Sequence, residues 1–246
     1  MTKSKNTLNI GDNGIDGVSI KPMGDSAVLV EFESDCERAA AFAKHLINNR
    51  VKSVVDVVPA LHSVGVHYAP EFWLDGPVNQ TPYERFVTVL RIVLRNVRPL
   101  DDAKTSYVKV PVVYGGEYGE DLAELAQQRN LSKKELIRLH SERVYTVHML
   151  GFAPGFCYMG PVDARIDTPR RASPRTRVKK GTVAVANGMT GIYPANLPGG
   201  WYLLGRTPLV MFDVERSPTC LVSVGDQVKF FEVSEEEFLR IEEAQV

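Results

Sequence analysis

The sequence contains few cysteines, and their number is odd. Its 246 residues include three, Cys36, Cys157 and Cys220, which lie far apart. A disulfide framework needs an even set of closely spaced cysteines, and reduced thiols are typical of cytosolic proteins. The histidines and cysteines also lack any CxxC, HxxxH or HExxH spacing. We therefore expect neither disulfides nor a metal site.

Long hydrophobic runs and an excess of either charge are missing as well. The polar opening MTKSKNTLNIGDNGIDG lacks the apolar centre of a signal peptide, and no later stretch is long enough to cross a membrane. A cytoplasmic protein without membrane contact is expected. The net charge of -1 gives no overall field for nucleic acid. Because neither GxxxxGK[ST] nor GxGxxG occurs, the motifs also exclude a P-loop or Rossmann nucleotide site.

Residues 18–97 have the pattern of a small α+β domain. Val28, Val30 and Phe32 alternate as in a half-buried strand, after a hairpin turn at Gly24-Asp25. A first helix is expected after the N-cap Asp35, and a second from a capping box at Thr81–Glu84 to Val97. The apolar positions expected on one face of the first helix are Ala39, Phe42, Ala43, Leu46 and Ile47.

The polar, proline-containing segment 98–106 predicts a linker to a second domain, residues 107–234. This domain begins with a strand, a helix from about Glu120, and a helix with a capping box of Ser132 and Glu135. Short strands, divided by glycine- and proline-rich turns, are expected at 144–150, 182–186, 201–205, 209–212 and 227–233. Their spacing predicts a mainly-β barrel of antiparallel strands, followed by a last helix that begins at Ser234.

Glycine- and proline-rich segments of the second domain are candidates for a binding site. They lie at 151–160, 169–178, 190–194 and 198–201. Residues of this kind fix turns and expose backbone N–H groups, although plain connections between strands have the same composition. Seven basic residues between Arg165 and Lys180 are accompanied only by Asp167. Such a segment fits a carboxylate, a phosphate or an acidic partner surface, or else a solvated loop.

The predicted binding residues come from these segments. Arg170 and Arg175 can present forked donors to a carboxylate or phosphate, and Thr190 and Tyr193 offer hydroxyl groups. Gly199 and Gly200 would permit close approach of the backbone to a ligand. A nucleic-acid ligand is not expected, because no aromatic residues interleave with the arginines.

Candidates for acid–base chemistry are fewer. His140 and Glu117 are the predicted catalytic residues, and His148 is a further candidate; a single histidine of this kind is more often a packed or surface residue. Asp121 forms an acidic pair with Glu117 around a glycine-rich turn, but capping of the next helix explains it as well. Cys157 is predicted to be a buried structural thiol, not a nucleophile, because no nucleophile elbow surrounds it.

Several long motifs resemble one family, which joins the B-type subunits of 5-oxoprolinase, allophanate hydrolase subunit 1 and the sporulation-kinase inhibitors. These motifs are HSERVYTVHMLGFAPGFCYMG, PRRASPRTRV and GTVAVANGMTGIYPANLPGGWYLLGRTPLVMFD. Upstream, VPVVYGGEYGEDL, MGDSAVLVEF and VVDVVPALHSV extend the resemblance over most of 18–234. It implies that the C-terminal domain is a cyclophilin-like barrel.

The resemblance also implies a function. The chain would be the B-type subunit of an ATP-dependent 5-oxoprolinase, inactive alone, that opens the lactam of 5-oxoproline to L-glutamate. ATP would be a co-substrate of the complex, with no tightly bound cofactor in this chain. The implied partners are a homologous second subunit, of the 5-oxoprolinase C type or the allophanate hydrolase subunit 2 type, and a third, A-type subunit. Two alternatives stay open: a histidine-kinase inhibitor without chemistry, and an allophanate hydrolase or urea carboxylase-type subunit.

The chain departs from the family pattern at several site positions. Met189 stands where the family usually has glutamine, and Leu197 where it has serine. Lys179 and Lys180 add two charges after the arginines. The departure at Met189 leaves the substrate open between 5-oxoproline, urea and another amide.

Overall fold

The computed structural model describes residues 15–97 and 106–245. The chain divides into two compact units, Met1–Pro99 and Leu100–Val246. The predicted linker, 98–106, lies outside the described residues except for Ser106. Each unit has its own hydrophobic core, and each is described by itself.

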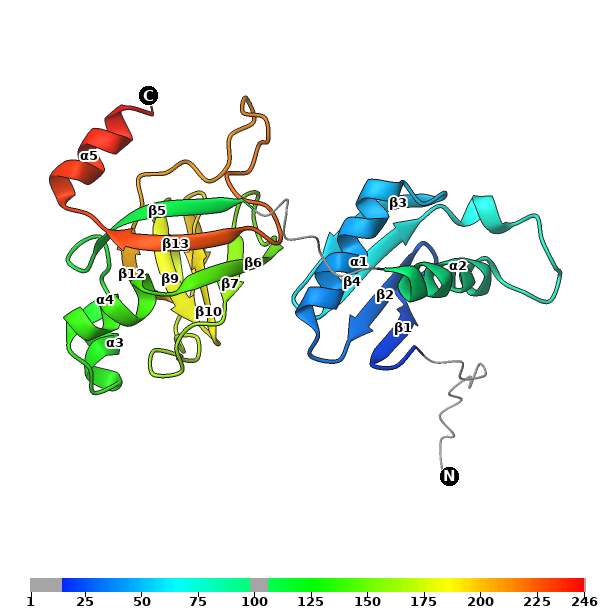
Figure 1. The fold of residues 1–246 in the computed structure, drawn as a ribbon, viewed down its shortest axis with the longest axis horizontal. Coiled ribbons are helices and arrows are strands. Elements are labelled where there is room, and N and C mark those ends of the chain that lie inside the picture. Colours follow the sequence, from blue (N-terminus) through cyan, green and yellow to red (C-terminus); the bar gives the residue numbers. More distant parts are fainter. Residues whose placement is uncertain (1–14, 98–105, 246) are drawn as a thin grey trace. The chain divides into compact units, whose positions relative to one another are not determined.

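The N-terminal unit is a four-stranded antiparallel sheet with two helices. The sheet order is β1-β2-β4-β3. Its elements are β1 (Val18–Pro22), β2 (Ala27–Phe32), α1 (Cys36–Asn49), β3 (Val54–Pro59), β4 (Ser63–Tyr68), η1 (Pro70–Trp73) and α2 (Pro82–Asn96). Val28, Val30 and Phe32 alternate along β2 and are all buried, so the sheet turns one apolar face to the helices. The predicted α+β layer is confirmed (Figure 1).

Local sequence signals position the two helices well. Asp35 caps α1 by accepting a hydrogen bond from the backbone N–H of Arg38 (2.8 Å). Thr81 and Glu84 form both hydrogen bonds of the capping box at α2. The expected buried face of α1 was wrong at one position, because the Ile47 side chain is 55% exposed. Ile47 lies beyond the edge of the stripe that Phe42, Ala43 and Leu46 bury.

The C-terminal unit is a closed seven-stranded barrel, with strand order β10-β7-β6-β13-β5-β12-β9. Its strands are β5 (Tyr107–Tyr114), β6 (Val144–Leu150), β7 (Cys157–Gly160), β9 (Thr182–Ala186), β10 (Met189–Ile192), β12 (Tyr202–Arg206) and β13 (Gln227–Glu232). The predicted mainly-β barrel is confirmed, but the expectation that all strands are antiparallel was wrong. The first and last strands, β5 and β13, pair in parallel and close the barrel.

Three helices accompany the barrel: α3 (Leu122–Gln128), α4 (Lys133–Ser141) and α5 (Glu235–Glu243). Ser132 and Ser234 cap α4 and α5 through backbone N–H groups of Glu135 and Glu237. The capping box predicted at Ser132 forms only this half, because the Glu135 carboxylate binds Arg138 instead. Leu136 and Leu139 of α4 pack into the barrel core.

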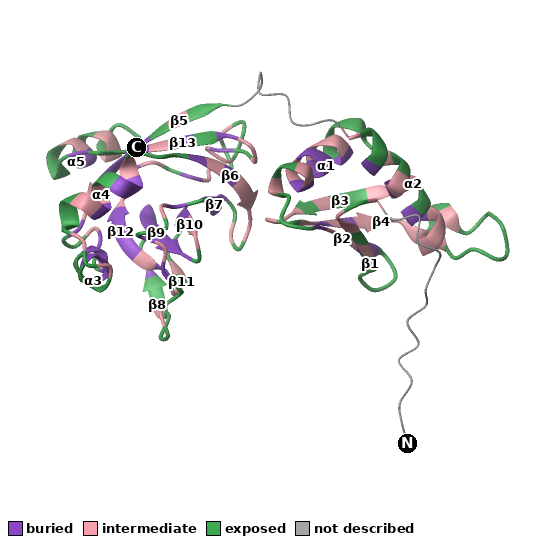
Figure 2. Cartoon of the chain, turned by 60° about the horizontal axis from the view of Figure 1, so that its bottom comes forward, coloured by how far each residue is buried: buried purple, intermediate pink, exposed green. Residues whose placement is uncertain are grey.

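The strand β9 is buried at all five positions because two apolar cores lie on its two sides. Val183 and Val185 point into the barrel, whereas Ala184 and Ala186 face a second, smaller core. Over this outer face lies a two-stranded ribbon of β8 (Arg175–Val178) and β11 (Leu197–Gly199). Figure 2 shows β9 as buried and much of β8 as exposed. The ribbon therefore brings the basic segment to the outer surface of the barrel unit.

Three local expectations for the barrel unit were wrong. Residues 209–212 form no strand; Phe212 makes only an isolated bridge to Cys220. The segments 175–178 and 190–192, predicted as loops, are strands, since they pair with β11 and with β7 and β9. Across the described residues, no helix is long and apolar enough to span a membrane, and no cluster of three potential metal-binding side chains was found.

Candidate functional site

A buried carboxylate, Asp121, organises the basic segment. Its Oδ1 accepts hydrogen bonds from Nη1 of Arg171 (2.9 Å) and Nη2 of Arg175 (2.7 Å). Its Oδ2 accepts one from the backbone N–H of Leu203 (2.8 Å). The side chain is 3% exposed, so both oxygens are used inside the fold. Asp121 is the N-cap residue of α3, as the capping interpretation expected, but its side chain makes no capping hydrogen bond there.

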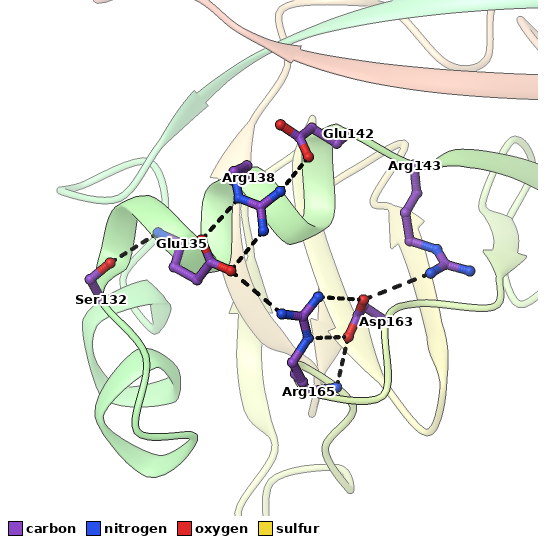
Figure 3. A network of polar contacts seen from close by, with 7 residues as sticks. All are labelled: Ser132, Glu135, Arg138, Glu142, Arg143, Asp163 and Arg165. Atoms are coloured by element: carbon purple, nitrogen blue, oxygen red, sulfur yellow. Dashed lines mark hydrogen bonds and ion pairs between the residues drawn. The ribbon is translucent and has the colours of Figure 1, made fainter.

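Further acidic residues from outside the basic segment form ion pairs with its arginines. Arg171 also binds Glu124 (2.9 Å) and lies over the Tyr202 ring, and Arg175 lies 3.6 Å from Glu120. Figure 3 shows Arg165 between Asp163 and Glu135 of α4. Hydrogen bonds from Arg165 hold the pKa of Asp163 well below its ordinary value. Much of the positive charge that the sequence leaves unbalanced is therefore paired in the fold.

The aromatic residues form a layer beneath the β8–β11 ribbon. Phe156 makes edge-to-face contacts with Tyr193 and Trp201, with ring centroids 5.2 and 5.7 Å apart. Tyr193 is 2% exposed, and desolvation raises the pKa of its hydroxyl. Arg170, which is exposed, is close enough to Tyr193 and Tyr158 to act on the pKa of both in the opposite direction.

Gly199 and Gly200 have different surroundings. A Cβ on Gly199 would lie 2.1 Å from Oη of Tyr193, so this position excludes a side chain in order to accommodate the tyrosine. A Cβ on Gly200 would meet nothing closer than 3.6 Å. The backbone carbonyl of Gly200 accepts a hydrogen bond from the N–H of Arg171 (2.7 Å). Gly199 therefore pairs with Arg175 of the basic segment, and Gly200 is hydrogen-bonded to Arg171 of the same segment. Gly199 also has a packing role, because Tyr193 lies against it.

His140 and Thr190 belong to a hydrogen-bonded chain inside the barrel. The Thr190 hydroxyl donates to the carbonyl of Ala184 (3.1 Å) and therefore accepts from Nε2 of His140 (2.9 Å). Nδ1 of His140 then accepts from the Tyr114 hydroxyl (2.7 Å). Both His140 and Thr190 are 0% exposed, and burial lowers the pKa of His140 to about 3. The imidazole is neutral and fully engaged, which accounts for it structurally; its predicted catalytic role stays a prediction.

The remaining candidates from the sequence are also engaged or buried. His148 donates through Nε2 to the carbonyl of Gly160 (3.2 Å). Cys157 is 0% exposed, and burial raises the pKa of its thiol to about 12. A thiol with this pKa is not a thiolate at neutral pH, in agreement with the predicted structural role.

A pocket of about 400 Å³ lies on the outer side of the barrel unit, next to the basic segment. Its charged lining comprises Glu117 and Glu120, which precede α3, together with Arg177, Lys179 and Arg206. Leu203 and Val178 contribute apolar surface. The pocket brings the predicted residue Glu117 together with the end of the arginine segment.

The structure therefore divides the predicted site residues into three places. Glu117 lines the pocket. Arg175 and Gly199 belong to the β8–β11 ribbon, Tyr193 lies under it, Gly200 follows it directly and Arg170 precedes it by five residues. His140 and Thr190 lie inside the barrel. Sequence reasoning did not select Arg177, Lys179 or Arg206 as site residues. Arg175 and Arg177 are two residues apart, so in a strand their side chains would lie on the same face. This spacing could have indicated Arg177 as a site residue alongside Arg175.

Comparison with known proteins identifies the class. The family described as "Carboxyltransferase domain, subdomain C and D" matches residues 18–222, and the chain belongs to this family. Curated relatives include the B-type subunit of 5-oxoprolinase from Bacillus subtilis, 35% identical over 89% of this chain and 94% of that protein. The protein of the same name from Haemophilus influenzae is 34% identical over 87% of this chain and 97% of its own length. The resemblance stated from the motifs is confirmed.

Solved structures share the fold. TTHA0988 is 32% identical with a TM-score of 0.71 over 85% of this chain, and the chain spans only 40% of the TTHA0988 chain. An uncharacterized protein of Pyrococcus horikoshii, PH0987, is 36% identical with a TM-score of 0.53, covering 89% of this chain and all of its own. The Kluyveromyces lactis urea carboxylase, 21% identical with a TM-score of 0.68, covers 92% of this chain and 22% of its own, and it supports the fold alone.

Proposed function

We propose that this chain is the B-type subunit of an ATP-dependent 5-oxoprolinase. In complex with partner subunits it would take part in opening the lactam of 5-oxoproline to L-glutamate. One observation carries the proposal: three curated relatives, each named as the B-type subunit of 5-oxoprolinase and each from a different bacterium, are 33–35% identical to this chain over 93–97% of their own length.

The chemistry requires a charged, partly enclosed surface. Hydrolysis breaks the ring C–N bond, adds the oxygen of water to the carbonyl carbon and leaves the protons on nitrogen. The substrate carboxylate needs cationic donors, for which the pocket offers Arg177 and Lys179, and the ring nitrogen needs an acid or base, for which we retain Glu117. Arg170, which is exposed but does not line the pocket, is retained as a further donor.

The proposal includes partners and a location. A homologous second subunit and a third subunit would complete the enzyme, and ATP would be consumed by the complex as a co-substrate. Reduced cysteines and the need for ATP support a cytoplasmic location for the complex. The isolated chain is expected to be inactive.

The test is reconstitution. The chain is co-expressed with its two presumed partner subunits, and ATP consumption and glutamate formation are measured with 5-oxoproline, with urea and without substrate. We expect turnover that depends on 5-oxoproline in the complex and none in the isolated chain. Turnover with urea alone would favour the urea carboxylase-type alternative, and a well-folded complex inactive with either substrate would refute both enzymatic functions.

A further inference from the structure

The pocket next to β8 contains charges of both signs that do not neutralise one another. Among the ion pairs and side-chain hydrogen bonds of the described residues, none engages the side chain of Glu117, Arg177 or Lys179. All three nevertheless line the same cavity of about 400 Å³. Charged side chains on one cavity that do not pair are available to a ligand that carries the complementary groups.

These charges come from two different segments of the barrel unit. Arg177 is fixed by the pairing of β8 with β11, and Lys179 follows directly. Glu117 lies in a tight turn held by hydrogen bonds from the N–H groups of Tyr118 and Gly119 to the carbonyl of Gly115 (3.1 and 2.9 Å). Gly119 packs so closely on the carbonyl of Leu204 that a Cβ there would lie 2.0 Å from its oxygen. The turn is therefore anchored to the barrel.

The other polar groups of the pocket already have partners. Arg206 donates from Nε to the carbonyl of Lys180 (2.9 Å) and binds Glu242 (3.3 Å). The Tyr118 hydroxyl donates to Glu235 (3.0 Å), and the Thr182 hydroxyl donates to the carbonyl of Lys179 (2.7 Å). Glu120, the second carboxylate of the lining, lies 3.6 Å from Nη2 of Arg175. Among the charged side chains that line the pocket, those of Arg177, Lys179 and Glu117 are therefore the ones without an ion pair or a side-chain hydrogen bond within the described residues.

We infer that this pocket binds a small carboxylate that also carries an N–H donor. The carboxylate would lie on Arg177 and Lys179, and the N–H would donate to Glu117. The apolar surface of Leu203 and Val178 would contact the carbon skeleton. The inference rests on the proposed function, because 5-oxoproline carries a carboxylate and a lactam N–H on one small ring. L-glutamate, the product, carries carboxylates and an ammonium group, whose N–H bonds are also donors.

The test combines binding to the chain with kinetics of the reconstituted complex. Binding of 5-oxoproline and L-glutamate is followed by amide NMR shifts, with 3-oxocyclopentane-1-carboxylate, which lacks the N–H, and inorganic phosphate as comparison ligands. The variants are Arg177→Gln, Lys179→Gln and Glu117→Gln; Lys109→Gln, at an exposed position of β5, is the matched control.

We expect shifts at Thr182 and Leu203 with 5-oxoproline or glutamate, and weaker binding of the analogue without N–H. In the complex, Arg177→Gln and Lys179→Gln should each raise KM for 5-oxoproline roughly tenfold or more, because a charge-assisted hydrogen bond is lost. Lys109→Gln should leave KM unchanged. Glu117→Gln keeps an acceptor oxygen but loses the charge, so it should reduce the preference for the N–H ligand over the analogue.

A wrong pocket assignment and a wrong proposed function would give different experimental results. If the wild-type complex turns over 5-oxoproline but all three variants match Lys109→Gln, the pocket assignment is wrong and the proposed function stands. If the complex is inactive but the chain binds glutamate through these residues, the pocket assignment stands and the proposed function is wrong. Binding of phosphate in preference to the carboxylates would also overturn the assignment.

Discussion

The two tryptophans allow the unfolding of each unit to be followed separately by fluorescence, because each unit contains one of them. One of them, Trp73, belongs to the core of the N-terminal unit, and the other, Trp201, to the outer core of the barrel unit. In a Trp73→Phe background, fluorescence therefore reports unfolding of the barrel unit alone. The stability predictions for the barrel unit use this background.

The side chain of Tyr193 lies so close to the backbone of residue 199 that only glycine fits there. Substitution to alanine would place a Cβ 2.1 Å from the tyrosine hydroxyl and 2.7 Å from its ring carbon, so the ribbon or the ring must move. We expect Gly199→Ala to lower the unfolding free energy of the barrel unit by about 1–3 kcal/mol, as overpacking does. Gly200→Ala, with its nearest neighbour at 3.6 Å, is the control and should cost clearly less. Equal effects in urea titrations would show that Tyr193 does not set this requirement.

His140 makes stability depend on pH. Its folded pKa of about 3 lies below the ordinary value of 6.5, because burial disfavours the charged ring. In the unfolded chain His140 binds a proton as the pH falls through about 6.5, whereas in the folded chain it binds one only near pH 3. The stabilising contribution is complete above this window and declines as the pH falls through it, by up to about 1.4 kcal/mol per pH unit.

The variant His140→Gln tests this directly. Glutamine can bond to Tyr114 and Thr190 but does not titrate. We expect it to be less stable than the wild type at neutral pH and to lose less stability between neutral pH and mildly acidic pH. Urea unfolding at both pH values measures the difference. A variant with the wild-type pH dependence would contradict the buried, neutral state of His140.

At the scale of elements, Asp121 joins three parts of the barrel unit. Its carboxylate binds Arg171 in the segment before β8, Arg175 in β8 and the backbone of Leu203 in β12. Removing its charge would leave two arginines without their buried partner. The ribbon would then lose the buried ion pair between Arg175 and Asp121.

We therefore expect Asp121→Asn to destabilise the barrel unit by roughly 3 kcal/mol, since one partner of a buried ion pair is removed. Glu124→Gln is the control, because Glu124 binds the same Arg171 but is 45% exposed and should contribute under about 1 kcal/mol. Urea unfolding of both variants gives the comparison. If the two changes have the same small effect, Asp121 does not anchor the ribbon.

At the scale of the whole molecule, the two units have separate cores. The core of the N-terminal unit is formed between Val28 and Leu94, and the barrel core between Val110 and Phe230. The sequence predicts the boundary in 98–106, where periodic apolar patterns end and begin again. The resulting expectation is that the two units fold independently.

Limited proteolysis tests this organisation. We expect the first cleavage within 98–106 and two resistant fragments, identified by mass spectrometry, because a segment between packed units offers the protease an accessible backbone. First cleavage within β5, or within α2, would count against the predicted domains of 18–97 and 107–234. Resistance of the whole chain to the protease would also count against these predicted domains.

Local patterns in the sequence determined most of the elements. The alternation in β2, the capping box of Thr81 and Glu84 and the N-caps Ser132 and Ser234 depend on residues only a few positions apart, so they could be read without a fold. The motifs also identified the family. The buried Cys157 followed from the absence of any activating sequence around it.

Tertiary structure alone decided which polar groups remain available. Asp121 meets its arginines across 50 and 54 residues of sequence and Leu203 across 82, and no local pattern encodes such pairs. The same holds for Thr190, which β10 turns inward to His140 while Met189 packs against the outer core. Charge and hydroxyl content are properties of the sequence, but pairing depends on distance in space. For that reason the sequence could nominate the basic segment, and only the fold showed that Arg171 and Arg175 are paired while Arg177 and Lys179 line a pocket.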